Sequence, residues 1–526
     1  MENRISEFLK ILSIGFLSIF IIINSVLLIS RYQYQKGINH LSAKSYDNAI
    51  ATFTRAQNLI PQILGKTLFL QDLVRIHTNK GKALHEKGLA LWKEKGISPT
   101  VFTIYKKAGT NFNKAVEIDS NDYITTYWLA KTQNALESLS GYLKPGKPNP
   151  YNARPLYEKA IALRPSGISV HYSYIRYLFN KGEKKRIPEL AQYMTRIYPP
   201  SYYHLKKEPF FNDDLLKNME QGLLIALDKN ITPKLALQAL SDIQVKKQNY
   251  KKAIYLYHKS MELEPLANTW KNYLYLGQLY LKTPAAKKAG ERGKSMPWFL
   301  KGLKTANNFD ATLARIFRIH TQEKALEEFI RFAILAQENL GYTQSLDINV
   351  AKAWIKLEKP QLARARLIKL NAKKPNANAH YLLAKIAEKE KNWNRVELSA
   401  QKATTLDREN AGYYQLFSKA LIYQRKYIHA EEIATKAITH APANNPWVYN
   451  NRARIRWRLK KYKQACQDWK KAFAIKPDRS DFPFRIALAL EQQGLFTQAL
   501  TYAQKALTLA PNNKKYKTLK KRLQHQ

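Results

Sequence analysis

The feature that most constrains this chain is a recurrence of small residues, with a period close to 34, in its last third. Val396, Ala430, Ala465 and Ala499 are separated by 34, 35 and 34 residues. An alanine follows each of them seven residues later, and in the last three copies a proline follows five residues after that alanine. A period of this length predicts stacked helix pairs, because one pair cannot bury its apolar face alone and must pack on its neighbours.

The residue types explain how such pairs would pack. A small residue lets two antiparallel helices approach closely, and a proline just beyond the second helix ends it before the next unit begins. The same order of small residues, aromatics and prolines occurs upstream, at 37–61, 108–115, 157–165, 191–199, 253–265 and 363–375.

This pattern resembles the tetratricopeptide repeat, a helix–turn–helix unit of 34 residues. The resemblance covers most of Arg31 to Asn513 and is strongest in the last third. It implies an all-α fold, namely a right-handed superhelical solenoid of helix–turn–helix repeats. The composition agrees, since only 19 of 526 residues are glycine and 45% are hydrophobic.

A single apolar segment precedes the repeats. Residues Ile11 to Ser30 carry no charge, and about 20 residues are enough to cross a bilayer as a helix. The segment ends without a small-x-small cleavage site, which predicts an uncleaved signal anchor. We therefore expect a single-pass protein of the bacterial inner membrane. The basic residues on the two flanks are nearly balanced or slightly favour a cytoplasmic solenoid. A short N-terminal tail before an uncleaved anchor instead favours an extracytoplasmic solenoid.

These features divide the chain into six predicted segments. They are a short tail (1–10), the transmembrane anchor (11–30), an N-terminal repeat array (31–200), an irregular middle region (201–344) with an insertion at 283–296, a regular C-terminal array (345–513), and a basic capping helix or tail (514–526).

The charge is unusual. Lys and Arg total 87 against 40 Asp and Glu, a formal net charge of +47. An excess of this size attracts anionic partners, but a solvated lysine-rich surface would give the same count. Cys466 is the only cysteine, so an intramolecular disulfide or a cysteine-based metal site is excluded.

Motifs for catalysis are not convincing. Gly290 to Ser295 reads GERGKS, but a phosphate-binding loop needs a further glycine where Lys288 stands, and a strand where the sequence predicts a helix. The eleven histidines form no zinc motif, and no nucleophile elbow occurs. The repeats also leave no room for a catalytic domain. We therefore predict no enzyme activity, no cofactor and no metal.

The resemblance implies a ligand groove lined by the first helix of each unit, at its second, fifth, ninth, twelfth and thirteenth positions. Lys and Arg at these positions can pair with carboxylates or phosphates, and aromatic rings provide flat contact surfaces. Members of the family with a carboxylate clamp use Lys, Asn and Arg in such a groove. The candidate groove residues are Tyr381, Lys385, Lys389, Lys419, Tyr423, Asn450, Arg454, Trp457 and Arg458.

Two functions remain open from the sequence. The first is a membrane-tethered scaffold that binds protein partners through the groove, in a cell-envelope or polysaccharide assembly pathway. The second is direct binding of an acidic polysaccharide or an anionic lipid surface by the basic solenoid. The membrane anchor disfavours nucleic acid as a partner.

Overall fold

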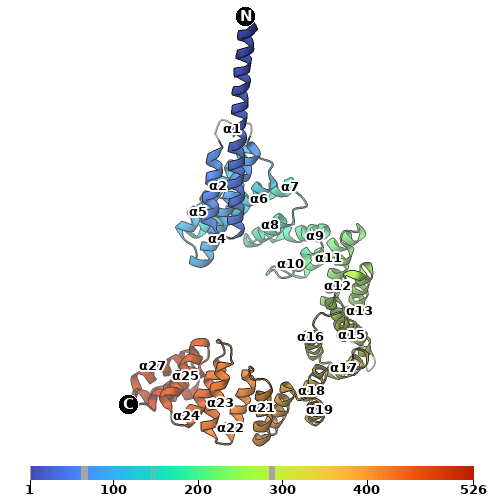
Figure 1. The fold of residues 1–526 in the computed structure, drawn as a ribbon, viewed down its shortest axis with the longest axis vertical. Helices are drawn as coiled ribbons and strands as arrows, with labels where there is room; N and C mark the ends of the chain where they lie inside the picture. The colour runs from blue at the N-terminus through green and yellow to red at the C-terminus, as the bar shows by residue number, and fades with distance from the viewer. Residues whose placement is uncertain (1, 61–68, 144, 147, 284–290) are drawn as a thin grey trace. The chain divides into compact units, whose positions relative to one another are not determined.

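The computed structural model of the chain describes residues 2–60, 69–143, 145–146, 148–283 and 291–526. Those residues form α-helices and short 3-10 helices joined by turns, and no strand occurs among them. Successive helices pack as antiparallel pairs along the chain (Figure 1). The prediction of an all-α solenoid of helix pairs is confirmed.

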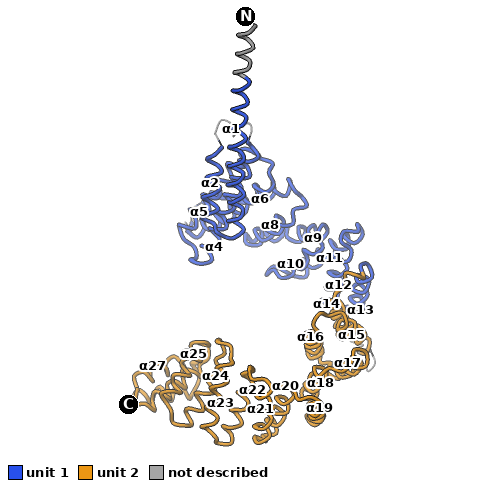
Figure 2. Tube along the Cα trace, viewed as in Figure 1, with its two compact units in different colours: residues 1–264 blue, residues 265–526 orange. Residues whose placement is uncertain are grey.

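The chain divides into two compact units (Figure 2). Unit 1 (1–264) contains α1 (Glu2–Ser42), α2 (Tyr46–Leu59), α4 (Leu70–Lys95), α5 (Pro99–Ile118), α6 (Tyr123–Leu143), α7 (Arg154–Leu163), α8 (Ile168–Asn180), α9 (Ile187–Ile197), α10 (Ser201–Leu205), α11 (Asp213–Asp228), α12 (Pro233–Lys246) and α13 (Tyr250–Leu263).

Unit 2 (265–526) contains the C-terminal helix pairs. Its α-helices are α14 (Trp270–Lys282), α15 (Met296–Lys304), α16 (Phe309–Gln322), α17 (Leu326–Leu340), α18 (Gln344–Lys356), α19 (Pro360–Lys373), α20 (Ala377–Lys389), α21 (Trp393–Leu406), α22 (Ala411–Tyr423), α23 (Tyr427–Thr439), α24 (Pro446–Arg458), α25 (Tyr462–Ile475), α26 (Asp481–Glu491), α27 (Phe496–Leu509) and α28 (Lys514–Gln524).

The predicted segment boundaries at 200 and 344 lie inside these units. The Pro- and Tyr-rich stretch after 199 forms the short helix α10, and α9 packs directly on α11 around it. The stretch 307–344, irregular in sequence, forms the helix pair α16 and α17, with Phe329 and Phe332 fully buried between helices. The insertion 283–296 lies largely outside the described residues; its described end is a 3-10 helix, Glu291–Ser295, leading into α15.

Helix α1 joins the apolar segment to the first repeat without a break. It runs from Glu2 to Ser42, so the predicted boundary at residue 30 falls inside one helix. Its residues 13–42 are long and apolar enough to cross a membrane, and the large side chains from Ile14 to Ile22 are mostly exposed. The later part of α1 packs on α2 and α4 as the first helix of a repeat.

Small residues set the spacing within the pairs. The alanines that define the repeat, such as Ala430 and Ala465, are completely buried. A Cβ added at Gly37 would lie 2.5 Å from the Phe53 ring, and one at Gly277 would lie 2.9 Å from the Phe299 ring. The glycines therefore admit aromatic rings of the partner helix that an alanine would displace.

The turns inside the C-terminal pairs also repeat. In each turn, the residue just before the second helix donates its N–H to the carbonyl of the residue five positions earlier. In one such turn Asn392 donates to Ala387 at 3.0 Å. This pattern ends a helix with one residue in the left-handed region. That residue is Lys391 (φ 58°), Arg425 (φ 62°), Lys460 (φ 59°) or Gly494 (φ 73°).

A buried histidine makes unit 2 sensitive to acid. His320 donates from Nδ1 to the carbonyl of Ile316 at 2.8 Å, while its buried Nε2 has no hydrogen-bond partner among the described residues. Phe299, Phe329 and Phe332 surround the ring. Burial lowers the pKa of His320 to about 4 from an ordinary 6.5.

As the pH falls, we expect His320 to be protonated in the unfolded chain at a higher pH than in the folded chain, so protonation favours unfolding. The free energy of unfolding is unaffected by His320 above about pH 6.5 and falls as the pH is lowered towards 4. At pH 5 the loss is about 2 kcal/mol. His320→Phe should flatten this dependence. Hydrogen–deuterium exchange of peptides from α16 and α17, compared with wild type at each pH, measures it. His525→Phe, at an exposed position, is the control; an unchanged acid response in His320→Phe would contradict the assignment.

Candidate functional site

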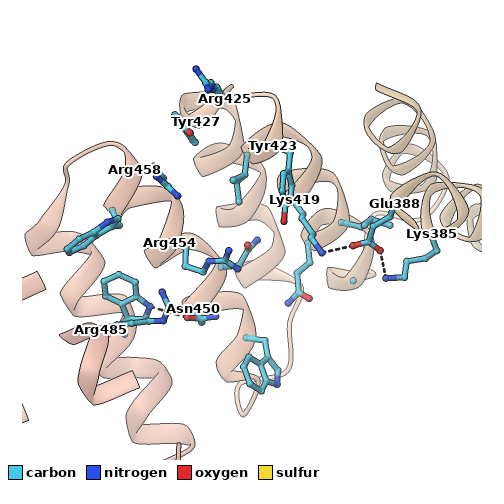
Figure 3. A pocket seen from close by; sticks show the side chains of 18 of the residues that line it. Lys385, Glu388, Lys419, Tyr423, Arg425, Tyr427, Asn450, Arg454, Arg458 and Arg485 are labelled. Atoms are coloured by element: carbon cyan, nitrogen blue, oxygen red, sulfur yellow. Dashed lines mark hydrogen bonds and ion pairs between the residues drawn. The ribbon is translucent and has the colours of Figure 1, made fainter. Parts of the chain in front are cut away.

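A basic groove crosses the first helices of the C-terminal pairs within unit 2 (Figure 3). It encloses about 870 Å³. Its walls come from α20, α22, α24 and α26, with contributions from the α22–α23 turn and from α25. The lining residues are Tyr381, Lys385, Glu388, Gly412, Gln415, Leu416, Lys419, Ile422, Tyr423, Arg425, Tyr427, Trp447, Asn450, Asn451, Arg454, Trp457, Arg458, Trp469, Arg485 and Leu488.

The structure brings most of the predicted groove residues together. Lys389, at the last turn of α20, is not among the lining residues. The residues that do line the groove are Tyr381, Lys385, Lys419, Tyr423, Asn450, Arg454, Trp457 and Arg458. Their role in binding remains a prediction.

Helix α24 presents its arginines to two different environments. Residues four apart share a helix face, so Asn450, Arg454 and Arg458 all face the groove. Arg452 and Arg456 project towards α25 instead, where both bond to Asp468. The alternation in the sequence RARIRWR therefore separates groove cations from structural ones.

Asp468 holds this part of the array together. Its side chain is only 2% exposed and accepts from Arg452 Nε and Nη2, at 2.9 and 2.8 Å, and from Arg456 Nη1 at 2.9 Å. Arg456 also donates from Nε to Glu431 at 2.8 Å. This network links α23, α24 and α25 and fixes the helix that carries the groove arginines.

One end of the groove is partly charge-compensated. Lys385 Nζ lies 2.5 Å from Glu388 Oε2, and Lys419 Nζ lies 2.6 Å from Glu388 Oε1 (Figure 3). Burial acts to raise the pKa of the Glu388 carboxyl, but the hydrogen bonds and attraction of the two lysines outweigh it and hold the pKa below its ordinary value. Both lysines therefore already have an anionic partner.

The other end is not compensated. Arg454 and Arg458 make no ion pair among the described residues, and Arg485 lies beside Arg454 (Figure 3). The Nε of Arg485 is buried without a hydrogen-bond partner. Burial, and then repulsion from Arg454, lower the pKa of Arg485. Two neighbouring guanidinium groups with unsatisfied donors suit a carboxylate or phosphate, which accepts two parallel N–H bonds.

Aromatic side chains complete the walls. Trp469 donates from Nε1 to the Oδ1 of Asn450 at 3.1 Å, which fixes this amide in the groove wall. Trp457 packs against Trp469, with ring centroids 6.0 Å apart. Tyr423 stacks on Trp393 at 3.8 Å between centroids. The groove therefore combines flat apolar surfaces with cations.

Sequence reasoning missed Glu388 and Arg485. Arg485 lies in α26 (Asp481–Glu491), the first helix of the following pair, and lines the groove from there. The proximity of Arg485 to Arg454 is visible only in three dimensions. Glu388 could have been found from its spacing of three residues from Lys385 on one helix.

No group of three or more potential metal ligands occurs in the part of the chain that the structure describes. The GERGKS motif begins outside those residues, and the segment before it is helix α14 rather than a strand.

The comparisons with known proteins agree with the helix-pair geometry. A family model described as tetratricopeptide repeat matches residues 450–514. No curated protein sequence matches the chain. Residues 450–514 therefore match a tetratricopeptide repeat, a class of repeat that generally mediates protein–protein contacts.

Similar solved structures include three repeat proteins. YrrB, titled a TPR protein with an unusual peptide-binding site, is 15% identical and covers 38% of this chain and 100% of its own (TM-score 0.33). MamA from Desulfovibrio magneticus RS-1 is 14% identical, and the match covers 32% of this chain and 96% of MamA (TM-score 0.30). A chain of the Cut9–Hcn1 complex is 12% identical and covers 94% and 96% (TM-score 0.34).

Proposed function

We propose that the chain is a non-catalytic, membrane-tethered scaffold that binds acidic segments of partner proteins in the basic groove. The observation that carries the proposal is the charge of the groove. Six cations line it, namely Lys385, Lys419, Arg425, Arg454, Arg458 and Arg485, against the single carboxylate of Glu388. Arg454 and Arg485 supply unpaired donors, and the tryptophans supply contact area for a peptide backbone.

The tether is the second part of the proposal. The exposed apolar face of α1 would anchor the chain in the bacterial inner membrane, with the solenoid on the extracytoplasmic side. A preformed groove held at a membrane suits the recruitment of envelope proteins, such as those that assemble or export polysaccharide. Repeat solenoids bind in this way with little ordering cost, because their surface is already built.

A direct test uses the purified full chain in detergent and a short fluorescent peptide that has acidic side chains and a free C-terminal carboxylate. We expect saturable binding by fluorescence anisotropy, weakened when each carboxylate of the peptide is replaced by an amide. Equal affinity for the acidic and amide peptides would reject the proposal.

The second candidate is an acidic polymer, favoured by the net charge of +47. An acidic polysaccharide would contact many cations and release many counterions. Its affinity should fall far more steeply with salt than that of a short peptide. A polysaccharide that bound tightly and was unaffected by changes in the groove would favour this alternative.

Glu388 should limit how long an acidic ligand the groove accepts. Its carboxylate pairs with both Lys385 and Lys419 and cancels one of their two positive charges, so acidic groups gain less at that end. Glu388→Gln removes the competing charge and should increase affinity for a longer acidic peptide by about tenfold, the value of roughly one charge-assisted hydrogen bond. Affinity for the short peptide should change little. Fluorescence anisotropy measures the affinity for both peptides. An equal gain in affinity for the short and the longer peptide would contradict the placement of the extra acidic groups beside Glu388.

A further inference from the structure

A second cavity lies in unit 1, where α1 leaves its apolar segment. It encloses about 350 Å³ between α1 and α4. Arg31, Tyr34 and Gln35 line it from α1, and Asp72 and Arg75 line it from α4. The cavity is separate from the basic groove, which belongs to unit 2.

Its position along α1 sets its depth. The uncharged run ends at Ser30, and Arg31 is the first charged residue after it. A run of about 20 apolar residues matches the hydrocarbon thickness of a bilayer, so the residues that follow it lie among the lipid headgroups. Tyr32, 65% exposed, occupies this level, where tyrosines are enriched in membrane proteins.

The first repeat approaches the bilayer at the same place. Ile23 and Leu27 of α1 pack on the cluster that contains Ile60 and Phe69, the last and first described residues on either side of the α2–α4 connection. These contacts lie within the apolar run. The end of the first repeat therefore reaches the hydrocarbon level beside α1. The cavity at residues 31–35 lies about 6–12 Å further along the helix than Leu27, at the level of the headgroups.

The polar groups of the cavity suit an anion. Arg31 Nη2 lies 3.2 Å from Asp72 Oδ2, so that pair is neutral overall. Arg75 makes no ion pair among the described residues. Tyr34 Oη accepts from Asn79 Nδ2 at 2.9 Å, which leaves the hydroxyl hydrogen available to donate. The cavity thus presents one uncompensated guanidinium, a second one shared with Asp72, and a hydroxyl donor.

We propose that this cavity binds the phosphate of an anionic phospholipid headgroup in the leaflet facing the solenoid. Arg75 donates two N–H bonds to the phosphate, and Tyr34 and Arg31 donate from the α1 side. The proposal rests on the membrane tether proposed above. It adds a lipid-specific site that would orient the first repeat on the bilayer, independently of the basic groove.

The test uses the full chain in nanodiscs with equal amounts of phosphatidylglycerol and phosphatidylethanolamine, with retained lipids counted by native mass spectrometry after release. We expect wild type to retain phosphatidylglycerol selectively, and Arg75→Gln to reduce its retention about tenfold. Arg31→Gln should have a smaller effect, because Asp72 already competes for that guanidinium.

Arg176→Gln is a matched control on α8. Its side chain is 61% exposed and pairs with Glu208, just as Arg31 is 61% exposed and pairs with Asp72. It should retain the lipid as wild type does. Equal retention of both lipids by wild type, or an unaffected Arg75→Gln, would overturn the headgroup site while leaving the tether intact. Release of the chain from membranes by alkaline carbonate would instead overturn the tether itself.

Discussion

Replacing Arg454 and Arg458 by glutamate should reduce binding of the acidic peptide by about 100-fold or more. Both side chains line the groove without an ion pair among the described residues. Each loses a charge-assisted hydrogen bond worth roughly 1.5–3 kcal/mol, and two such losses exceed a factor of 100. Because both positions are exposed, the fold should be retained. Fluorescence anisotropy of the full chain gives the affinity, and circular dichroism checks the fold.

Two charge reversals elsewhere serve as controls. Lys389→Glu changes a residue that the sequence places in the groove but the structure does not. Lys436→Glu changes an exposed lysine of α23 outside the groove. Both should leave affinity within a few-fold of wild type. If they weakened binding as much as the double change, net charge rather than the groove would explain the interaction.

Replacing Asp468 by alanine should destabilise the C-terminal repeats by about 3–5 kcal/mol. The change leaves the partly buried guanidinium groups of Arg452 and Arg456 beside each other without their shared carboxylate, and only Arg456 keeps another carboxylate partner, Glu431. Because the stability of a repeat array comes from neighbouring units, the loss should spread to the adjacent pairs. Urea unfolding followed by tryptophan fluorescence measures it, since Trp457 and Trp469 lie in this region.

Hydrogen–deuterium exchange should locate the damage in α24 and α25. Asp468→Asn keeps part of the hydrogen bonding and should lose less stability. Asp478→Ala removes an exposed carboxylate nearby and should have little effect. A loss in Asp468→Ala no larger than in Asp478→Ala would contradict the role of the buried network.

The helix-pair fold could be predicted from the sequence because its determinants are local and repeated. Alanines such as Ala430 recur at the period of the unit. Each is buried at a contact between two helices, where a larger side chain would keep the helices apart. The pair α16 and α17 escaped this reasoning, because Phe329 and Phe332 fill the contact and no terminal proline marks its end. The continuity of α1 past Ser30 escaped it too, because hydropathy changes there while the helix does not end.

The groove could be predicted only in part. Helical spacing correctly brought Asn450, Arg454 and Arg458 to one face, because that face depends on geometry alone. Spacing did not show that Glu388 pairs with two of the predicted cations, or that Arg485 reaches the groove from the next unit. Contacts between side chains of different units depend on the distance between neighbouring helices. The pattern of residues within one repeat does not specify that distance.

The most direct test of the central claim is site-specific photo-crosslinking in cells that express the full chain. A photoreactive amino acid at Gln415, which lines the groove, should form adducts with a partner protein. The adducts should disappear when Arg454 and Arg458 are changed to glutamate, and the same amino acid at Lys436 should give none. Adducts from Lys436 that equal those from Gln415, or adducts that persist in the double variant, would contradict binding in the basic groove.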